Sequence, residues 1–378
     1  MGQPTPPIDR PLAITGCGVL SSIGVGLDEF AVALDGGRSG RVPLAGGSFS
    51  EPLPGEHACV MHAFDPATFL GRKGTAFFDR TTSLVVVACG LALKESDLIV
   101  TDQNRNRVGI TIGTSTGSVK SVSDFARDTL VQERPYLVNP VLFPNTVMNA
   151  AAGQAAIWHV LKGINATVSG GQLSSLLAMR YASMGIRQGY VDVVLAGGVE
   201  EFSPQTAWGY HHTRALEATE TLVGEGCAIF VIEDAAAVRA AGRTPLAQLL
   251  ACDVGTAAQP SDASGVSRAL ARCIHRALAR GGVTGDQVWA VCGSFSGDPL
   301  FDQVEDEGIG QVLGRIPAVV PRIKPQLGEC YSAAGALQIA AVLSLYRTRP
   351  GPPGRVALVT SVDRDGSVGC AVVMEGYA

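Results

Sequence analysis

The stretch INATVSGGQLSSLLAMRYA, residues 164–182, decides the fold of this chain. Its opening residues form an apolar, β-branched run typical of a strand, which ends at Gly170 and Gly171. Apolar residues then recur at three- and four-residue steps up to Gly189, which predicts a helix that begins at Gln172. A strand, a tight turn and a helix N-terminus form an elbow that presents one side chain, here Gln172, to the positive end of the helix dipole.

Strand-like runs alternate with helix-like runs along the whole chain, which predicts a layered α/β fold. Several runs are continuously apolar, as expected of strands that are covered on both faces. A second helix is predicted from Val266 to Leu278, closing at Gly281, and the alanine-rich stretch 234–243 separates two halves of similar content. The predicted strands are residues 12–16, 108–113, 164–169, 191–196, 228–233, 246–254, 288–292, 318–321, 356–361 and 369–374.

The composition excludes several classes of partner. Net charge is −5, and the 29 Lys and Arg residues are scattered, so a nucleic acid is not expected. The apolar run 84–93 is too short to span a membrane and predicts a buried core helix. Only 17% of the residues are charged, which indicates that extra surface is hidden in an oligomer.

The N-terminus and the cysteines point to a reducing compartment. The sequence MGQPTPPIDRP lacks the features of a secretory signal, so we expect a cytoplasmic protein. Nine cysteines, an odd number, occur singly without CxxC spacing, so neither a disulfide framework nor a metal site is expected.

Five motifs together resemble the β-ketoacyl synthases of fatty acid and polyketide assembly, members of the thiolase-like superfamily. They are ITGCGVLSSIG from Ile14, IGTSTGS from Ile112, residues 140–172 with the elbow, LAGGVEE from Leu195 and GEGCAIFVIED from Gly224. The resemblance implies a thiolase-like, five-layer αβαβα fold with two similar halves. We expect these halves to be residues 1–240 and 241–378.

The residues that such ketosynthases use for condensation are absent. The family's cysteine falls on Gln172, which cannot form a thioester. Its first histidine aligns with Ser294 in SFSGDPLFD, and its second with Glu329 in KPQLGECYSAAG. The motif residues Pro299, Asp302, Glu305 and Lys324 remain, whereas the glycine-rich gating loop aligns with residues 362–368 and keeps only Gly366.

This combination of features resembles the chain length factors of type II polyketide synthases. The resemblance implies a pseudoenzyme with no cofactor of its own, in a heterodimer with an active ketosynthase, acting on phosphopantetheine-linked chains on an acyl carrier protein. It implies that strand 164–169 pairs across the dimer axis. The shortened loops favour a polyene-type product. The residues implied to line or reach the substrate tunnel are Thr116, Ser118, Ser121, Val122, Phe125 and Leu142.

Two other functions stay open: a malonyl decarboxylase of the Gln-for-Cys type, and a purely structural partner. A decarboxylase needs hydrogen-bond donors aimed at an enolate, and the replacement of both histidines removes them. Without the resemblance, the helix after IGTSTGS reads as an ordinary surface helix anchored by Phe125. Five further residues are expected to carry no chemistry: His211 and His212 in a loop, His159 in the core or an interface, and Cys292 and Cys330 as packing residues.

Overall fold

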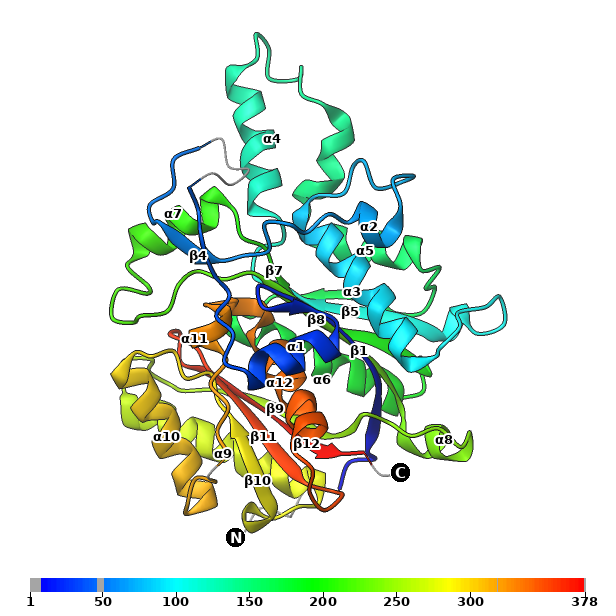
Figure 1. The fold of residues 1–378 in the computed structure, drawn as a ribbon, viewed down its shortest axis with the longest axis vertical. Coiled ribbons are helices and arrows are strands. Elements are labelled where there is room, and N and C mark those ends of the chain that lie inside the picture. Colours follow the sequence, from blue (N-terminus) through cyan, green and yellow to red (C-terminus); the bar gives the residue numbers. More distant parts are fainter. Residues whose placement is uncertain (1–7, 46–50, 318, 377–378) are drawn as a thin grey trace.

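The computed structural model describes residues 8–45, 51–317 and 319–376. Figure 1 shows a layered body from which the helix α4 projects at one end. The strands are β1 (Leu12–Ser21), β2 (Gly24–Val25), β3 (Arg41–Pro43), β4 (His57–Cys59), β5 (Val108–Gly113), β6 (Asn165–Val168), β7 (Val193–Glu200), β8 (Gly226–Asp234), β9 (Ala247–Thr256), β10 (Val288–Cys292), β11 (Val356–Val362) and β12 (Ser367–Glu375).

The helices connect and cover these strands. They are α1 (Leu27–Asp35), α2 (Ala67–Leu70), α3 (Arg80–Ser96), α4 (Val119–Val131), α5 (Ala150–Trp158), α6 (Ser174–Arg187), α7 (Pro204–Thr213), α8 (Ala235–Ala240), α9 (Ala263–Gly281), α10 (Pro299–Leu313), α11 (Lys324–Leu327) and α12 (Ala334–Thr348). Short 3-10 turns include η2 (Pro140–Thr146), η3 (Gly171–Leu173) and η5 (Tyr331–Ala333).

The sheet repeats one topology twice. In space, the N-terminal strands run β1-β8-β7-β5-β6, and the C-terminal strands run β9-β12-β11-β10 with a bridge from β10 to Val319. In each set the first strand in sequence lies beside the last one and is antiparallel to it. The next two pairings in space are antiparallel and then parallel: β8 with β7 and β7 with β5 in the first set, and β12 with β11 and β11 with β10 in the second. Three residue pairs between β1 and β9 join the two sets into one sheet. At the far end of this order β6 is an edge strand among the described residues.

Helices separate and cover the two sets of strands in five layers, as the sequence predicts. The helices α3 and α5 pack on the outer face of the first set, and α9 and α10 pack on the outer face of the second. The helices α6 and α12 lie between the two sets (Figure 1). In this middle layer both faces of a helix must be apolar, which is why α12 is buried along most of its length.

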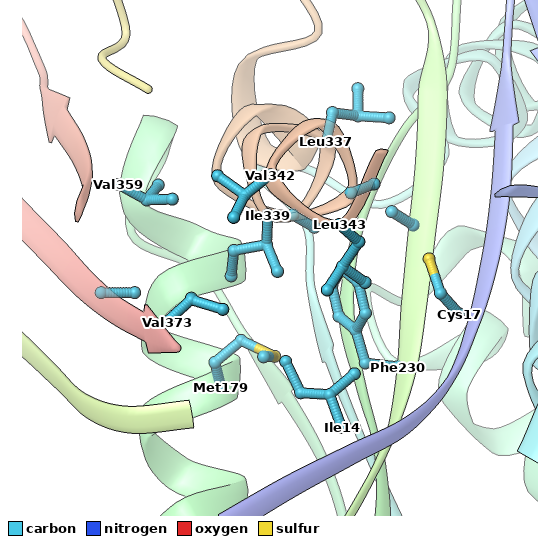
Figure 2. Close-up of a cluster of buried hydrophobic side chains, with 14 of the residues drawn as sticks. Ile14, Cys17, Met179, Phe230, Leu337, Ile339, Val342, Leu343, Val359 and Val373 are labelled. Carbon is cyan, nitrogen blue, oxygen red and sulfur yellow. The ribbon is translucent and has the colours of Figure 1, made fainter. Parts of the chain in front are cut away.

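The central core joins both halves of the sequence. Figure 2 shows Ile14 of β1 and Phe230 of β8 facing Met179 of α6 and Leu343 of α12, with Val373 of β12 on the left beside Met179. All five side chains are buried. Because this core fixes α6 against both sets of strands, it also fixes the turn at the beginning of α6.

Most predicted elements are confirmed, with three corrections. The second predicted helix, α9, runs through Gly281 and closes one residue later, at Gly282, whose left-handed φ of 67° suits glycine. The predicted strand 318–321 is reduced to a single bridge at Val319, and Ala318 lies outside the described residues. The sequence prediction also missed β2, β3 and β4, which are too short to show an alternating pattern.

The prediction for the apolar run 84–93 is confirmed, because it forms the buried middle of α3. Within the described ranges, no helix combines the length and apolar character that crossing a bilayer requires. The prediction from the N-terminal sequence falls mostly on residues 1–7, which lie outside the described residues.

Candidate functional site

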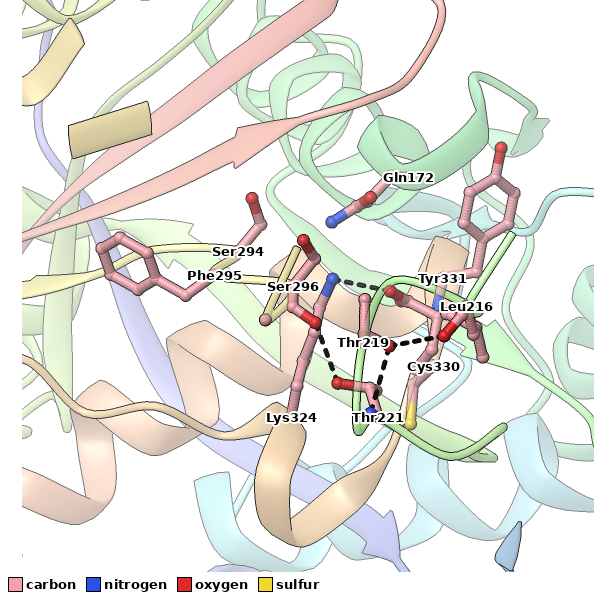
Figure 3. A network of polar contacts seen from close by, with 12 residues as sticks. Gln172, Leu216, Thr219, Thr221, Ser294, Phe295, Ser296, Lys324, Cys330 and Tyr331 are labelled. Carbon is pink, nitrogen blue, oxygen red and sulfur yellow. Dashed lines mark hydrogen bonds and ion pairs between the residues drawn. The ribbon is translucent and has the colours of Figure 1, made fainter. Parts of the chain in front are cut away.

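A cavity of about 570 Å³ brings together the three positions that the motifs align with the catalytic residues of active ketosynthases. Gln172, Ser294 and Glu329 all line it, although they come from three separate segments of the chain. Figure 3 shows Gln172 and Ser294 near each other, above Lys324. The alignment of motifs in the sequence therefore identifies one common site.

The predicted elbow before α6 is present, but α6 begins at Ser174 rather than at Gln172, which lies in η3. After β6, Gly171 adopts a left-handed φ of 56°, and η3 carries Gln172 into α6. A Cβ at Gly171 would lie 2.2 Å from Asp363 Oδ2 and 2.9 Å from the Tyr331 hydroxyl, so the turn requires glycine for space as well as for conformation. The backbone N–H of Gln172 donates to Asp363 Oδ2 at 2.7 Å, which ties the elbow to the turn after β11.

The side chain of Gln172 offers an amide and no nucleophile. The residue is 7% exposed, and its Nε2 has no hydrogen-bond partner among the described residues. An amide at this point can donate or accept a hydrogen bond, but it cannot carry an acyl group.

The hydroxyl group of Ser294 is hydrogen-bonded to a buried carboxyl group. Its hydroxyl donates to Glu305 Oε2 at 2.8 Å and accepts from the backbone N–H of Val362 at 3.2 Å. Glu305 also accepts from Thr360 and from the N–H groups of Ser294 and Phe295. Burial raises the pKa of Glu305, in opposition to these bonds. The single hydroxyl proton of Ser294 is thus committed to Glu305 rather than directed at a ligand.

Glu329 is half of a buried ion pair. Lys324 Nζ lies 2.6 Å from Glu329 Oε2, and both side chains are buried. The other carboxylate oxygen accepts from the backbone N–H of Tyr331 at 2.9 Å. The retained lysine therefore neutralises the carboxylate that replaces histidine, and neither group is free to act as an acid or base.

Two neighbouring glutamates that the sequence prediction did not single out also line the cavity. Glu200 accepts from Ser115 at 2.7 Å and from Ser332, and Glu201 accepts from Thr81 at 2.9 Å. Burial raises the pKa of each to about 7, although these hydrogen bonds oppose the shift. Two consecutive carboxylates at the end of an apolar strand are a sequence signal that could have identified them, because buried carboxyl groups need partners.

The six residues predicted for the tunnel divide into three places. Thr116 lines the cavity, whereas the other five lie outside its lining. Ser118 and Ser121 form hydrogen bonds at the base of α4, and Ser118 is the N-cap of that helix. Phe125 packs edge to face on Phe143 of η2, with 5.8 Å between ring centroids. Val122 and Leu142 are exposed, since this projecting segment has few neighbours within the chain.

The three histidines singled out in the sequence lie in two different environments. His211 and His212 lie in the last turn of α7, not in a loop. Ser203 caps this helix and Pro204 occupies its first position, a start signal that the sequence prediction overlooked. His159 accepts or donates one bond, between Nε2 and the Val86 carbonyl at 2.9 Å, and burial lowers its pKa.

All nine cysteines are buried and unpaired. Burial raises the pKa of Cys292 and of Cys330, which keeps both thiols protonated and unreactive. Packing is therefore their role, as predicted. Among the described residues no group of side chains is arranged to hold a metal ion.

Comparisons with known proteins identify the family of this chain. Models of the β-ketoacyl synthase N-terminal and C-terminal domains match residues 9–242 and 246–354. The 3-oxoacyl-(acyl-carrier-protein) synthase 2 of Vibrio cholerae is 27% identical, over 89% of this chain and 86% of that protein. The actinorhodin polyketide putative β-ketoacyl synthase 2 of Streptomyces coelicolor is 28% identical, over 93% and 89%.

Solved structures match over nearly the whole length. The structure described as the ishigamide ketosynthase/chain length factor has a TM-score of 0.85 and 35% identity, covering 97% of this chain and 99% of its own. A β-ketoacyl synthase from Burkholderia phymatum has a TM-score of 0.83 at 21% identity, which shows the shared fold.

Proposed function

This chain belongs to the β-ketoacyl synthase family, and we propose that within it the chain is a non-catalytic chain length factor that pairs with an active ketosynthase. The partner supplies the cysteine and both histidines for decarboxylative condensation of malonyl units on an acyl carrier protein. This subunit needs no cofactor of its own. It contributes one wall of the tunnel into which the growing chain extends.

The proposal rests on the side chains at the former catalytic positions and on the bonds that they form. Gln172 has no nucleophilic atom, the Ser294 hydroxyl is bonded to Glu305, and Glu329 is paired with Lys324. Ser294 and Glu329 are held by internal contacts that a catalytic group would have to break, whereas the Gln172 Nε2 has no partner among the described residues. A pocket that keeps its shape while the polar groups of Ser294 and Glu329 are bonded within the chain suits a subunit that shapes the tunnel without catalysing the reaction.

The same contacts weigh against malonyl decarboxylation by this chain alone. An enolate needs donors aimed at its oxygen in the transition state. At the two histidine positions, one proton is given to Glu305 and the other group is a carboxylate. The Gln172 amide is the remaining donor among the three, and one donor does not replace two histidines.

The edge strand β6 and its surroundings support pairing with a homologous subunit. Exposed apolar side chains lie on the helices that contact β6, including Ile157 on α5, and Tyr181 and Met184 on α6. A free strand edge flanked by large apolar groups is the kind of surface that soluble proteins cover with a partner. We propose that β6 pairs with the corresponding strand of the ketosynthase.

The projecting arm, defined as α4 together with η2, supports the measuring role. It carries further exposed apolar residues, among them Val122, Leu142 and Phe143. An arm with so few internal contacts is stable only if another surface covers it. We propose that the partner covers it and that Phe125, Val122 and Leu142 line the shared tunnel with Thr116. We also propose that the pair makes a polyene-type product.

Reconstitution tests the function. The purified pair, supplied with malonyl carrier protein, is expected to make chains of a defined length, whereas this chain alone releases no carbon dioxide. Carbon dioxide release by this chain alone would support the decarboxylase instead. If the partner alone gives the same product lengths as the pair, a purely structural role replaces the measuring role.

A further inference from the structure

The base of α4 is held by a cluster of hydrogen-bonded side chains, called here the anchor cluster: Asp79, Thr81, Ser118, Ser121 and Glu201. Ser118 Oγ lies 2.9 Å from Ser121 Oγ and 3.0 Å from Glu201 Oε1. Ser121 Oγ donates to Asp79 Oδ2 at 3.2 Å, and Thr81 Oγ1 donates to Glu201 Oε2 at 2.9 Å. The cluster joins α4 to α3 and to the residue that follows β7.

The cluster matters because α4 has little other attachment to the body. No residue of this fully described helix is buried, although its N-cap Ser118 is. Toward η2 the helix makes the Phe125–Phe143 contact, but η2 belongs to the same projecting arm. Toward α7 it receives one long bond of 3.4 Å from Gln205 to Ser123. In Figure 1 the helix rises from the body end-on, so its first turn fixes its direction.

The two glutamates at the end of β7 hold the first turn of α4 and the segment just before it. Successive residues of a strand point to opposite faces. Glu200 accordingly binds Ser115, three residues before the N-cap, whereas Glu201 binds Ser118 and the backbone N–H of Lys120 at 3.3 Å. Because β7 lies between β8 and β5 inside the sheet, these bonds tie the beginning of α4 to an interior strand.

We propose that the anchor cluster positions α4 and thereby sets the chain length that the tunnel allows. Ser118 and Ser121 act in this proposal through the carboxylates that hold them, not as surfaces that touch the chain. Asp79 and Thr81 are positioning residues outside the cavity lining, whereas Glu201 lines the cavity and positions α4 through its bonds to Ser118 and the backbone N–H of Lys120. The effect on length rests on the proposed function, whereas the anchoring of α4 does not.

Two adjacent threonines on α3 provide a matched pair of variants. Thr81→Val removes the hydroxyl that holds Glu201 and keeps the side-chain shape. Thr82→Val removes a buried hydroxyl that has no partner among the described residues. We expect Thr81→Val, and likewise Ser121→Ala, to speed amide hydrogen exchange in residues 119–131 at least about fivefold. Thr82→Val should leave it unchanged, and Thr81→Ser, which keeps the hydroxyl, should behave as wild type.

Exchange in β12, which lies in the other half of the sheet, separates loosening of α4 from general unfolding. A selective change in residues 119–131 supports the anchor. Equal exchange in wild type, Thr81→Val and Ser121→Ala overturns it, and so does a rise in β12 as large as that in α4.

Product lengths from the reconstituted pair then test the consequence. We expect Thr81→Val to broaden the distribution of lengths with total product within about twofold of wild type. If α4 loosens and the distribution stays the same, the positioning role is wrong. If Phe125→Ala also leaves it the same, the proposed measuring function fails, while the anchor seen by exchange stands.

Discussion

At the scale of single residues, most polar side chains at the site's key positions form hydrogen bonds or ion pairs with other side chains of this chain. Gln172, Ser294 and Glu329 lie at one cavity, yet two of them are tied by short bonds to Glu305 and Lys324. These two partners are residues that the motif retained. In this chain these retained residues hold the side chains of Ser294 and Glu329.

The buried carboxyl of Glu200 makes stability depend on pH. Burial raises its pKa to about 7 from an ordinary 4.5, so between these values the folded chain holds a proton that the unfolded chain releases. Its contribution is complete below about pH 4.5 and is lost as the pH rises through about 7. Glu200→Gln cannot ionise, so relative to wild type it should gain up to about 3 kcal/mol between about pH 5 and pH 8.

Urea unfolding at the two pH values measures this gain. Glu217→Gln is the control, because Glu217 is exposed and paired with Arg214, which lowers its pKa. A difference between Glu200→Gln and wild type that is the same at both pH values would contradict the expectation.

The three former catalytic positions were predictable from the sequence because each lies beside residues of a recognisable motif. The bonds that occupy them were not, since Ser294 and Glu305 meet only after α10 packs against β10 and β11. Ser118 and Ser121 show the same limit. The resemblance placed both among the tunnel residues, but nothing in the sequence predicted that Ser118 caps the helix or that both bind carboxylates from distant segments.

At the scale of elements, α4 and η2 form an arm whose internal contact is the Phe125–Phe143 pair. Such an aromatic pair contributes about 0.5–1.5 kcal/mol beyond the burial of its area. We expect Phe125→Ala to open space at the tunnel wall and to lengthen the product of the reconstituted pair by about one two-carbon unit or more. Mass spectrometry of the released chains measures this length.

The control for Phe125→Ala is Leu300→Ala, since Leu300 is a similarly large apolar residue exposed on α10. The control should leave the product unchanged. Products of wild-type length from Phe125→Ala would remove Phe125 from the tunnel wall.

Long elements were predicted well because their signal is internal. The strands β5 and β10 match their predicted bounds, and α6 and α9 follow from apolar periodicity over several turns. Elements that depend on distant partners were missed. The three-residue strands β3 and β4 exist because they pair with each other, and the start of α7 depends on one serine cap.

At the scale of the whole molecule, the repeated strand order and the edge at β6 predict a pair of similar subunits. Ile157 on α5 is 73% exposed beside this edge. Ile157→Glu would bury a charge in the proposed interface, so we expect the dissociation constant of the pair to rise at least about 100-fold. Analytical ultracentrifugation of the mixed subunits measures the change.

Val32→Glu on α1 is the matched control, because Val32 is equally exposed (69%) but lies near β2. Both variants should keep the melting temperature of wild type. Undiminished pairing by Ile157→Glu would place the interface elsewhere.

We propose that condensation occurs in the partner, while this chain forms one wall of the tunnel. Intact-protein mass spectrometry of the working pair tests it most directly, by weighing each subunit after a pulse of malonyl carrier protein and starter. We expect acyl mass on the partner's cysteine and an unmodified mass for this chain. Acyl mass on this chain, with elongation continuing when the partner's cysteine is replaced by alanine, would contradict the claim.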